Sequence, residues 1–310
     1  MSLHLVVGAG AVGSVVAQLL ADSGERVRLV SRSGRGPGHP AVERVAADAA
    51  DADRLRELAR GTVAVYNCVN PRYHRWPTDW PPMAAALLGA AESAGAVLAI
   101  TGNLYGYGPV DGPMTEDLPL AATSRKGQVR ARMWQEALAA HAAGRVRVTE
   151  ARGSDYVGPG ADSLFTFAGP AVLAGKTVRL PVSLDLPHTV TYTEDMARTL
   201  VTIAREEKAW GQPWHVPSAP ARTVRELVTE YAQIAGAPQP RLTSVSRAVM
   251  GAVGLFSAPL REMAEMRYQF ERSFVLDSSR VTREFGLTAT PLAESLAATA
   301  AGGAVPVGAA

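Results

Sequence analysis

The sequence has little of several residue types, and each scarcity excludes a class of protein. Cys68 is the one cysteine among 310 residues, so no disulfide forms within the chain and a reducing cytoplasm is expected. No apolar run reaches the roughly 18 to 20 residues that cross a bilayer. The 6 histidines form no i, i+4 pair, which argues against a metal site. The net charge is +2 without a basic run, which argues against nucleic acid and membrane surfaces as partners.

What remains is the composition of an ordinary globular protein. Apolar residues make up 47% of the chain and charged residues 19%, and the length suits one large domain with a smaller one. An apolar run begins at Leu3, so we expect no signal peptide. Of the 31 basic residues only Lys126, Lys176 and Lys208 are lysines. Each lysine is informative because arginine is otherwise preferred.

A glycine-rich turn follows the first apolar run. The segment Leu3–Val7 leads into a G-x-G-x-x-G motif at Gly8, Gly10 and Gly13, and a helical pattern follows. In a dinucleotide-binding loop the first glycine permits the turn, the second lets the backbone approach the pyrophosphate, and the third lets helix and strand pack closely. The helix N-terminus supplies free N–H groups and a partial positive charge. The motif therefore predicts a bound dinucleotide.

The end of the second strand indicates which dinucleotide binds. NAD-binding sites usually place an acidic residue there to bond the ribose 2′-hydroxyl. This chain has Ser31, Arg32 and Ser33 instead, with no carboxylate. A small serine leaves room, and an arginine pairs with a 2′-phosphate by charge-assisted hydrogen bonds. We therefore expect NADP(H), the alternative being that Arg32 is a solvated loop charge.

Strand-like runs alternate with helical patterns through the first half of the chain. The strands are expected at Leu3–Val7, Arg26–Val30, Val63–Asn67, Val97–Thr101 and Arg145–Glu150. The helices are expected at Ser14–Ala21, Asp53–Arg60, Met83–Ala94 and Gln128–Ala142. This alternation predicts a Rossmann-type, doubly wound parallel α/β sheet.

The second half of the sequence has a different rhythm. Its expected elements are helices at Ser163–Ala174, Glu194–Arg205, Thr223–Ala235 and Arg261–Phe270, and a strand at Thr177–Leu180. We expect an NADP-binding domain over residues 1–160, with later segments returning to its sheet. A mixed α/β substrate lobe is expected over residues 161–300, and a frayed Ala/Gly-rich tail near the end, over residues 301–310.

Several motifs together resemble one family. Asp48-Ala49 follows a third strand that would lie between those expected at Arg26–Val30 and Val63–Asn67. A Thr-Gly-Asn-Leu-Tyr-Gly segment starts at Thr101, and Arg152 precedes a Gly-Pro-Gly at residues 158–160. An acidic segment at Tyr192–Ala197, a strand at residues 214–216 and a helix start at Thr223 follow in order. This order resembles the extended short-chain dehydrogenase/reductase superfamily, in its NAD(P)-dependent epimerase/dehydratase branch.

The resemblance implies a set of site residues. The cofactor contacts expected from the motifs are Gly8, Gly10, Ala11, Val12, Gly13, Ser31, Arg32, Ser33, Asp48, Ala49, Cys68, Val69, Asn70, Lys126, Ser154 and Tyr156. The catalytic candidates are Thr101, Lys126, Asn103 and Tyr105. Thr101 and Lys126 are expected to flank the nicotinamide, and Asn103 and Tyr105 to point into the substrate cleft.

The catalytic motif departs from the family pattern. Where the family has Tyr-x-x-x-Lys, this chain has Lys126-Gly-Gln-Val-Arg130, and the other register places Ala122 at the tyrosine. Lys126 between like charges would lose its proton more easily, which suits a general acid. Alternatively Lys126 only contacts the ribose and Tyr105, Tyr107 or Tyr156 supplies the proton. In a third interpretation the protein performs no hydride transfer.

Three functions follow from these alternatives. The first is an NADP(H)-dependent oxidoreductase acting on a small, largely apolar carbonyl, enone or imine, favoured by the apolar segment at residues 249–256. The second is an NAD(P)-dependent epimerase or dehydratase acting on a sugar nucleotide, for which Arg179 and Arg261 are candidate diphosphate contacts. The third is a non-catalytic NADP(H)-sensing protein. A monomer and a homodimer are both compatible with the sequence.

Overall fold

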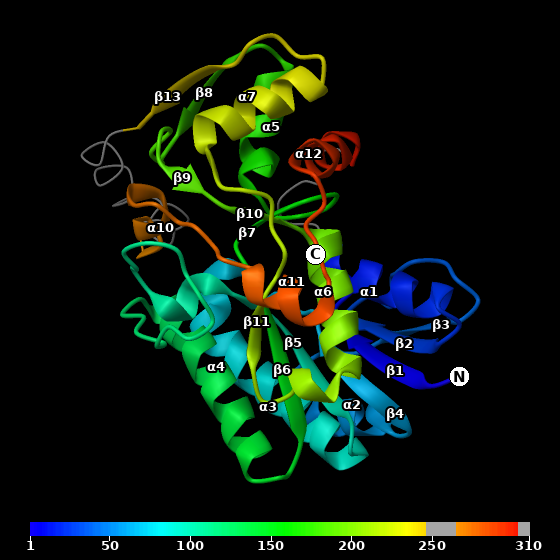
Figure 1. Ribbon diagram of the computed structural model, residues 1–310. Helices are drawn as coiled ribbons and strands as arrows, with labels where there is room; N and C mark the ends of the chain where they lie inside the picture. The colour runs from blue at the N-terminus through cyan, green and yellow to red at the C-terminus, as the bar shows by residue number, and fades with distance from the viewer. Residues whose placement is uncertain (246–264, 303–310) are drawn as a thin grey trace.

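A seven-stranded parallel sheet forms the centre of the protein (Figure 1). The computed structural model describes residues 1–245 and 265–302. The strands lie in the order β11-β6-β5-β4-β1-β2-β3, with every neighbouring pair parallel. Their bounds are Leu3–Val7 (β1), Arg26–Ser31 (β2), Val42–Ala46 (β3), Thr62–Asn67 (β4), Val97–Asn103 (β5), Arg147–Gly153 (β6) and Pro213–His215 (β11). This is the doubly wound α/β sheet that the sequence predicts.

Helices cover both faces of the sheet (Figure 1). They are α1 (Ala11–Asp22), α2 (Ala52–Ala59), α3 (Trp76–Ala94), α4 (Arg125–Ala142), α6 (Thr193–Arg205) and α11 (Ser279–Phe285). Val6 of β1 packs into the core beneath α1 and α6, whereas Leu5 and Val7 pack into the core beneath α2, α3 and α4. The apolar run of β1 is buried on both faces, as parallel strands between two helical layers require.

The carboxyl ends of the central strands lie at one edge of the sheet. Val7 of β1 is in register with Val30 of β2 and Asn67 of β4, and Asn103 of β5 is in register with Gly153 of β6. Ligands of such sheets bind beyond these ends. The register therefore gathers the segments that follow β1, β4, β5 and β6.

A smaller lobe lies beyond that edge (Figure 1). It contains β7 (Asp155–Val157), α5 (Leu164–Leu173), β8 (Thr177–Leu180), β9 (Pro187–His188), β10 (Val190–Tyr192), β12 (Arg222–Thr223), α7 (Val224–Ile234), β13 (Arg241–Ser244), α10 (Tyr268–Glu271) and α12 (Leu292–Ala301). Its strands pair two by two, β7 with β10, β9 with β12, and β8 with β13. Its own core joins α5, α7 and α12 through Phe165, Val228 and Leu296. The described residues also contain three 3-10 turns, η1 (Tyr73–Arg75), η2 (Leu104–Tyr107) and η3 (Glu207–Ala209).

Three expectations about elements need correction. Helix α3 begins at Trp76 rather than Met83, because Pro77 lies in the first turn, where a missing N–H costs nothing, and the helix tolerates Pro81 and Pro82. The frayed tail is expected from residue 301, but Ala301 is the last residue of α12. Residues 303–310 lie outside the described part. The helix expected from Arg261 falls partly outside it too, and inside it α10 covers four residues.

Two structural absences hold within residues 1–245 and 265–302. No helix there is long and apolar enough to span a membrane. That part of the chain also contains no group of three or more His, Cys, Asp and Glu side chains arranged to hold a metal ion.

Candidate functional site

The glycine turn between β1 and α1 has the geometry of a nucleotide cradle. Gly8 adopts φ +106°, and a Cβ there would lie 2.4 Å from the carbonyl oxygen of Cys68. A Cβ on Gly13 would lie 1.8 Å from the carbonyl oxygen of Gly8. A Cβ on Gly10, in contrast, would meet no protein atom within 4 Å. Two glycines are therefore required by the fold, whereas Gly10 keeps space open in front of the turn.

The first turn of α1 faces the same space. Gly10 is the N-cap residue, no side chain caps the helix, and its first turn holds no acidic residue. The N–H groups at Ala11 and Val12 thus keep their usual need for an acceptor. Together with the space at Gly10, this arrangement fits a pyrophosphate.

The end of β2 is open to solvent. Arg32 and Ser33 are exposed, and the Ser31 hydroxyl donates to the carbonyl of Arg35 at 2.8 Å. Beyond β3, Asp48 accepts the N–H of Ala50 at 2.9 Å, which fixes the loop, and Ala49 is buried. Ser31 therefore holds the loop that presents Arg32.

The segment after β4 closes against the glycine turn. The Cys68 N–H donates to the carbonyl of Val7 at 2.8 Å, and the thiol lies 3.7 Å from the hydroxyl of Thr101. Burial raises the pKa of Cys68 to about 12, so the thiol stays protonated. Val69 is half-buried and Asn70 is exposed. Cys68 is thus a wall of the cradle rather than a reactive thiolate.

Thr101 and Asn103 leave the carboxyl end of β5 in different roles. The carbonyl of Thr101 accepts an N–H of Arg130 at 3.1 Å. The side-chain oxygen of Asn103 accepts the N–H of Tyr105 at 3.1 Å and caps η2. Asn103 therefore positions Tyr105 through the backbone.

Lys126 is paired with a carboxylate from a distant segment. Its side chain is 1% exposed, and its Nζ donates to Glu265 at 2.7 Å. The backbone N–H of Lys126 donates to the other Glu265 oxygen at 2.9 Å, and Nζ lies 4.5 Å from the centre of the Tyr73 ring. The Lys126 hydrogen bonds hold the pKa of Glu265 below its usual range, against the effect of burial. Lys126 therefore has a carboxylate beside it, which the expectation of like-charge surroundings does not include.

Arg130 is the second cation of the site. Its guanidinium lies between the rings of Trp76 and Trp80, 4.8 Å and 4.4 Å from their centres. Burial lowers the pKa of Arg130, and its buried Nε has no hydrogen-bond partner among the described residues. An unpaired buried donor costs about 1–3 kcal/mol, which a ligand that accepts from Nε would recover.

The candidate tyrosines are poor sources of phenolate. Burial raises the pKa of Tyr105 and of Tyr156, and it raises the pKa of Tyr107 to about 12. The Tyr156 hydroxyl donates to the carbonyl of Gly102 at 2.9 Å. The N–H of Ser154 donates to a threonine hydroxyl, whereas its own buried hydroxyl lacks a partner in the described part of the chain.

Arg152, part of the family-like motif, lies in a buried network instead of the site. It donates to Glu150 at 2.6 Å and to the Tyr107 hydroxyl at 2.8 Å. Tyr107 in turn lies 2.8 Å from Nε2 of His215, whose Nδ1 lies 2.9 Å from the carbonyl of Asp277. Burial lowers the pKa of His215 and so favours the neutral ring, whose Nε2 accepts a hydrogen bond from the Tyr107 hydroxyl. The network joins η2, β6 and β11.

The structure adds residues that sequence reasoning missed. Near the ends of β5 and β6 it places Tyr73, Asp155, His188, Glu265 and Gln269. Spacing gives no signal for Glu265, which is 139 residues from Lys126. The proposed diphosphate contact Arg179 is exposed on β8, and Arg261 lies outside the described residues.

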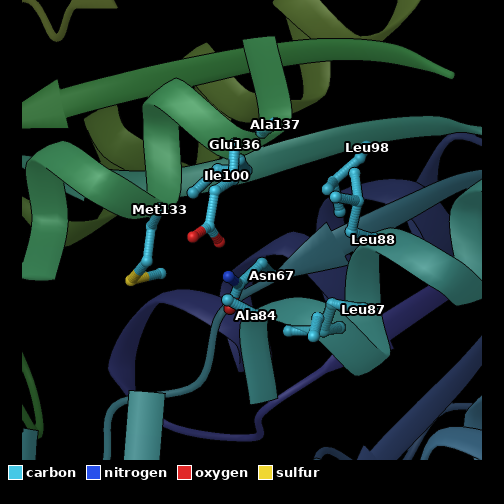
Figure 2. A pocket seen from close by; sticks show the side chains of 10 residues that line it. Asn67, Ala84, Leu87, Leu88, Leu98, Ile100, Met133, Glu136 and Ala137 are labelled. Atoms are coloured by element: carbon cyan, nitrogen blue, oxygen red, sulfur yellow. The ribbon is translucent and has the colours of Figure 1, made fainter. Parts of the chain in front are cut away.

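A cavity of about 80 Å³ lies elsewhere, between α3 and α4. Figure 2 shows Met133 and Glu136 of α4 facing Ala84 and Leu87 of α3 across it. Sites for small molecules usually measure roughly 300–1,000 Å³. This groove is therefore too small to be the main ligand site.

The fold and the glycine cradle define a Rossmann-type nucleotide-binding protein, and the comparisons assign its family. The model of the NAD dependent epimerase/dehydratase family matches residues 4–216. The chain belongs to this family, whose members are NAD-dependent enzymes, and its likeness to extended short-chain dehydrogenases/reductases is confirmed.

Solved structures share the fold over nearly the whole chain. MoeE5 in complex with UDP-glucose and NAD is 22% identical, with a TM-score of 0.77, over 97% of this chain and 98% of that one. The Bordetella bronchiseptica enzyme WbmH in complex with NAD+ is 20% identical, with a TM-score of 0.75, over 97% and 98%. UDP-glucose 4-epimerase of Thermotoga maritima with UDP-glucose is 17% identical, with a TM-score of 0.77, over 96% and 97%. No curated protein matches the sequence.

Proposed function

We propose that the protein is an NADP(H)-dependent enzyme that oxidises or reduces a carbinol or carbonyl carbon of a small molecule. The open space at Gly10, in front of the uncapped N-terminus of α1, carries the proposal. The family match and the NAD bound by structural neighbours support a nicotinamide dinucleotide. The bound cofactor would supply or accept the hydride.

The chain's own residues would position the reactants. The Gly8–Gly13 turn and the N-terminus of α1 would bind the pyrophosphate. Exposed Arg32, with no carboxylate beside it, favours a ribose 2′-phosphate. Thr101 and Arg130, joined by the hydrogen bond from Arg130 to the Thr101 carbonyl, would hold the nicotinamide ribose, and the unpaired Nε of Arg130 would donate to its hydroxyls.

A sugar nucleotide is the substrate class that the family and the neighbours favour, since two neighbours hold UDP-glucose and another is a dTDP-glucose 4,6-dehydratase. The reaction would then be an epimerisation or dehydration, in which the cofactor is reduced and reoxidised within one turnover.

A reductase of a small, largely apolar carbonyl is the second candidate. It is favoured by the aromatic side chains beside Arg130 and Lys126, namely Trp76, Trp80 and Tyr73. Both cations already face a carboxylate or aromatic rings, which suits an uncharged substrate better than a diphosphate.

Calorimetric titration with NADPH and NADH, after removal of bound nucleotide, tests the proposal. We expect NADPH to bind at least about tenfold more tightly, a difference of about 1.4 kcal/mol. UDP-glucose and dTDP-glucose are then added to the complex and the nicotinamide absorbance is followed, with an apolar ketone panel in parallel. Equal affinities would refute the NADP(H) assignment, and failure of both nucleotides to bind would refute the function.

A further inference from the structure

Asp155 and His188 form an ion pair beside the carboxyl ends of β5 and β6. Nε2 of His188 lies 2.9 Å from Oδ2 of Asp155, and its Nδ1 lies 3.2 Å from the carbonyl oxygen of Gln269. A carboxylate and a backbone carbonyl only accept hydrogen bonds. The imidazole therefore bonds both partners when it carries a proton on each nitrogen, as an imidazolium.

The two members of the pair differ in access. The His188 side chain is 4% exposed, whereas that of Asp155 is 27% exposed. The imidazole stacks against Phe270 and Phe274, with ring centres 4.7 Å and 5.2 Å away. His188 is thus shielded from solvent, and Asp155 is the member that a ligand can reach.

The surroundings place Asp155 at the candidate reaction site. Residues 154–156 are held against the end of β5, because the Tyr156 hydroxyl donates to the carbonyl of Gly102. The charge of Asp155 contributes to raising the pKa of Tyr73 and of Tyr105, after burial. The titratable groups that interact electrostatically with Asp155 are Tyr73, Tyr105, Asp162 and Tyr268, and Glu265 acts on Tyr73 and Tyr268 as well.

Gln269 contacts the pair and lies near these phenols. It is 3% exposed and accepts from His188 through its backbone carbonyl, and its side chain influences the pKa of Tyr105. The side-chain oxygen of Gln269 and the hydroxyl of Tyr268 are buried without a partner among the described residues. Unpaired polar atoms that are this well buried indicate a place for a ligand with hydrogen-bonding groups.

We propose that Asp155, held by His188, is the acid/base of the reaction and replaces the tyrosine that this chain lacks. This inference rests on the proposed function. In the oxidative direction the substrate's O–H bond breaks and its proton passes to Asp155. The C–H bond breaks as well, and its hydrogen leaves with both electrons for the oxidised nicotinamide dinucleotide, so that a carbonyl results. Reduction reverses each transfer.

Proton counting on nucleotide binding tests the pair without a substrate. The oxidised nicotinamide ring is positively charged and the reduced ring is neutral, so only the oxidised form would oppose the imidazolium of His188. Calorimetry in buffers of different ionisation enthalpy should show net proton release with NADP+ and close to none with NADPH. Asp155→Asn and His188→Gln should abolish the difference, whereas Asp162→Asn, the neighbouring carboxylate, should retain it.

Turnover supplies the second readout. Asp155→Asn keeps an acceptor for His188, so we expect unchanged NADPH affinity, a kcat about 100-fold lower and loss of the acidic limb of the pH profile. His188→Gln serves as the fallback if Asp155→Asn unfolds. Nucleotide binding without differential proton release, or full kcat in Asp155→Asn, would overturn this proposal and leave the proposed function intact. Absence of nucleotide binding would overturn both.

Discussion

The two ends of the candidate site are built differently. The cradle for the nucleotide comes from six consecutive residues, Gly8 to Gly13, and its shape is a property of the backbone. The substrate end comes from side chains far apart in the chain, such as Lys126 with Glu265 and Asp155 with His188. The cradle therefore depends on local backbone geometry, whereas the substrate end depends on tertiary contacts between distant residues.

The largest effect should separate structural from ligand-facing glycines within the cradle. Gly13→Val places its Cβ within 1.8 Å of the Gly8 carbonyl, so we expect no measurable nucleotide binding and about 3 kcal/mol or more of lost stability. Gly10→Ala meets no protein atom, so its unfolding should match wild type while NADPH affinity falls about tenfold or more. Calorimetry and denaturant unfolding measure the two. Wild-type NADPH affinity in Gly10→Ala would show that the glycine turn does not bind the nucleotide.

The next prediction distinguishes two roles of Lys126, as the ion-pair partner of Glu265 and as a catalytic group. Lys126→Met leaves the Glu265 carboxylate without its ammonium, so we expect about 2 kcal/mol of lost stability and a kcat/KM about 100-fold lower. Adding Glu265→Gln should restore most of the stability, because no charge is then stranded, but none of the turnover. If the double variant regains turnover, Lys126 acts only as the partner of Glu265.

A smaller effect should fix the choice of nucleotide. Arg32→Ala should weaken NADPH about tenfold and leave NADH unchanged, because only NADPH carries the 2′-phosphate. Arg35→Ala is the matched control. Arg35 stabilises the loop through its backbone carbonyl, which accepts from the Ser31 hydroxyl and which the substitution keeps. Parallel losses for both nucleotides would show that Arg32 acts on the fold of the loop.

The smallest effect concerns a buried histidine far from both ends. His4 is 3% exposed with neither ring nitrogen bonded among the described residues, and burial lowers its pKa to about 4. The unfolded state, with a pKa near 6.5, then binds more protons, so stability should fall as pH drops from about 6.5 to about 4. His4→Phe should flatten the pH dependence of unfolding in that range. A curve as steep as wild type would exclude His4 as its source.

The same difference between the two ends of the site determines which features the sequence predicts. The sheet, the cradle and most helices follow from periodicity and turn chemistry, which act over a few residues. The expected start of α3 at Met83 is too late, because a helix can also contain prolines in its first two turns. Residues 42–46 form β3 although only two of the five are valines, since pairing with β2 holds them.

The substrate end needs tertiary structure. Lys126 was expected among like charges because sequence reasoning compared it with Arg130, four residues away, whereas its partner is Glu265. His188 belongs to a two-residue strand with no motif, and only its contacts with Asp155 and Gln269 give it a role. Long-range pairs of this kind leave no period in the sequence.

The return of the chain to the sheet has a consequence during synthesis. One face of the sheet is covered jointly by α1 and α6, through Leu20 of α1 and Leu200 of α6 in one core. A nascent chain that has emerged as far as residue 160 holds β1 to β6 but lacks α6 and β11. Apolar side chains on that face therefore stay exposed to water until α6 has emerged, about 45 residues later. Chaperones are needed most during this interval.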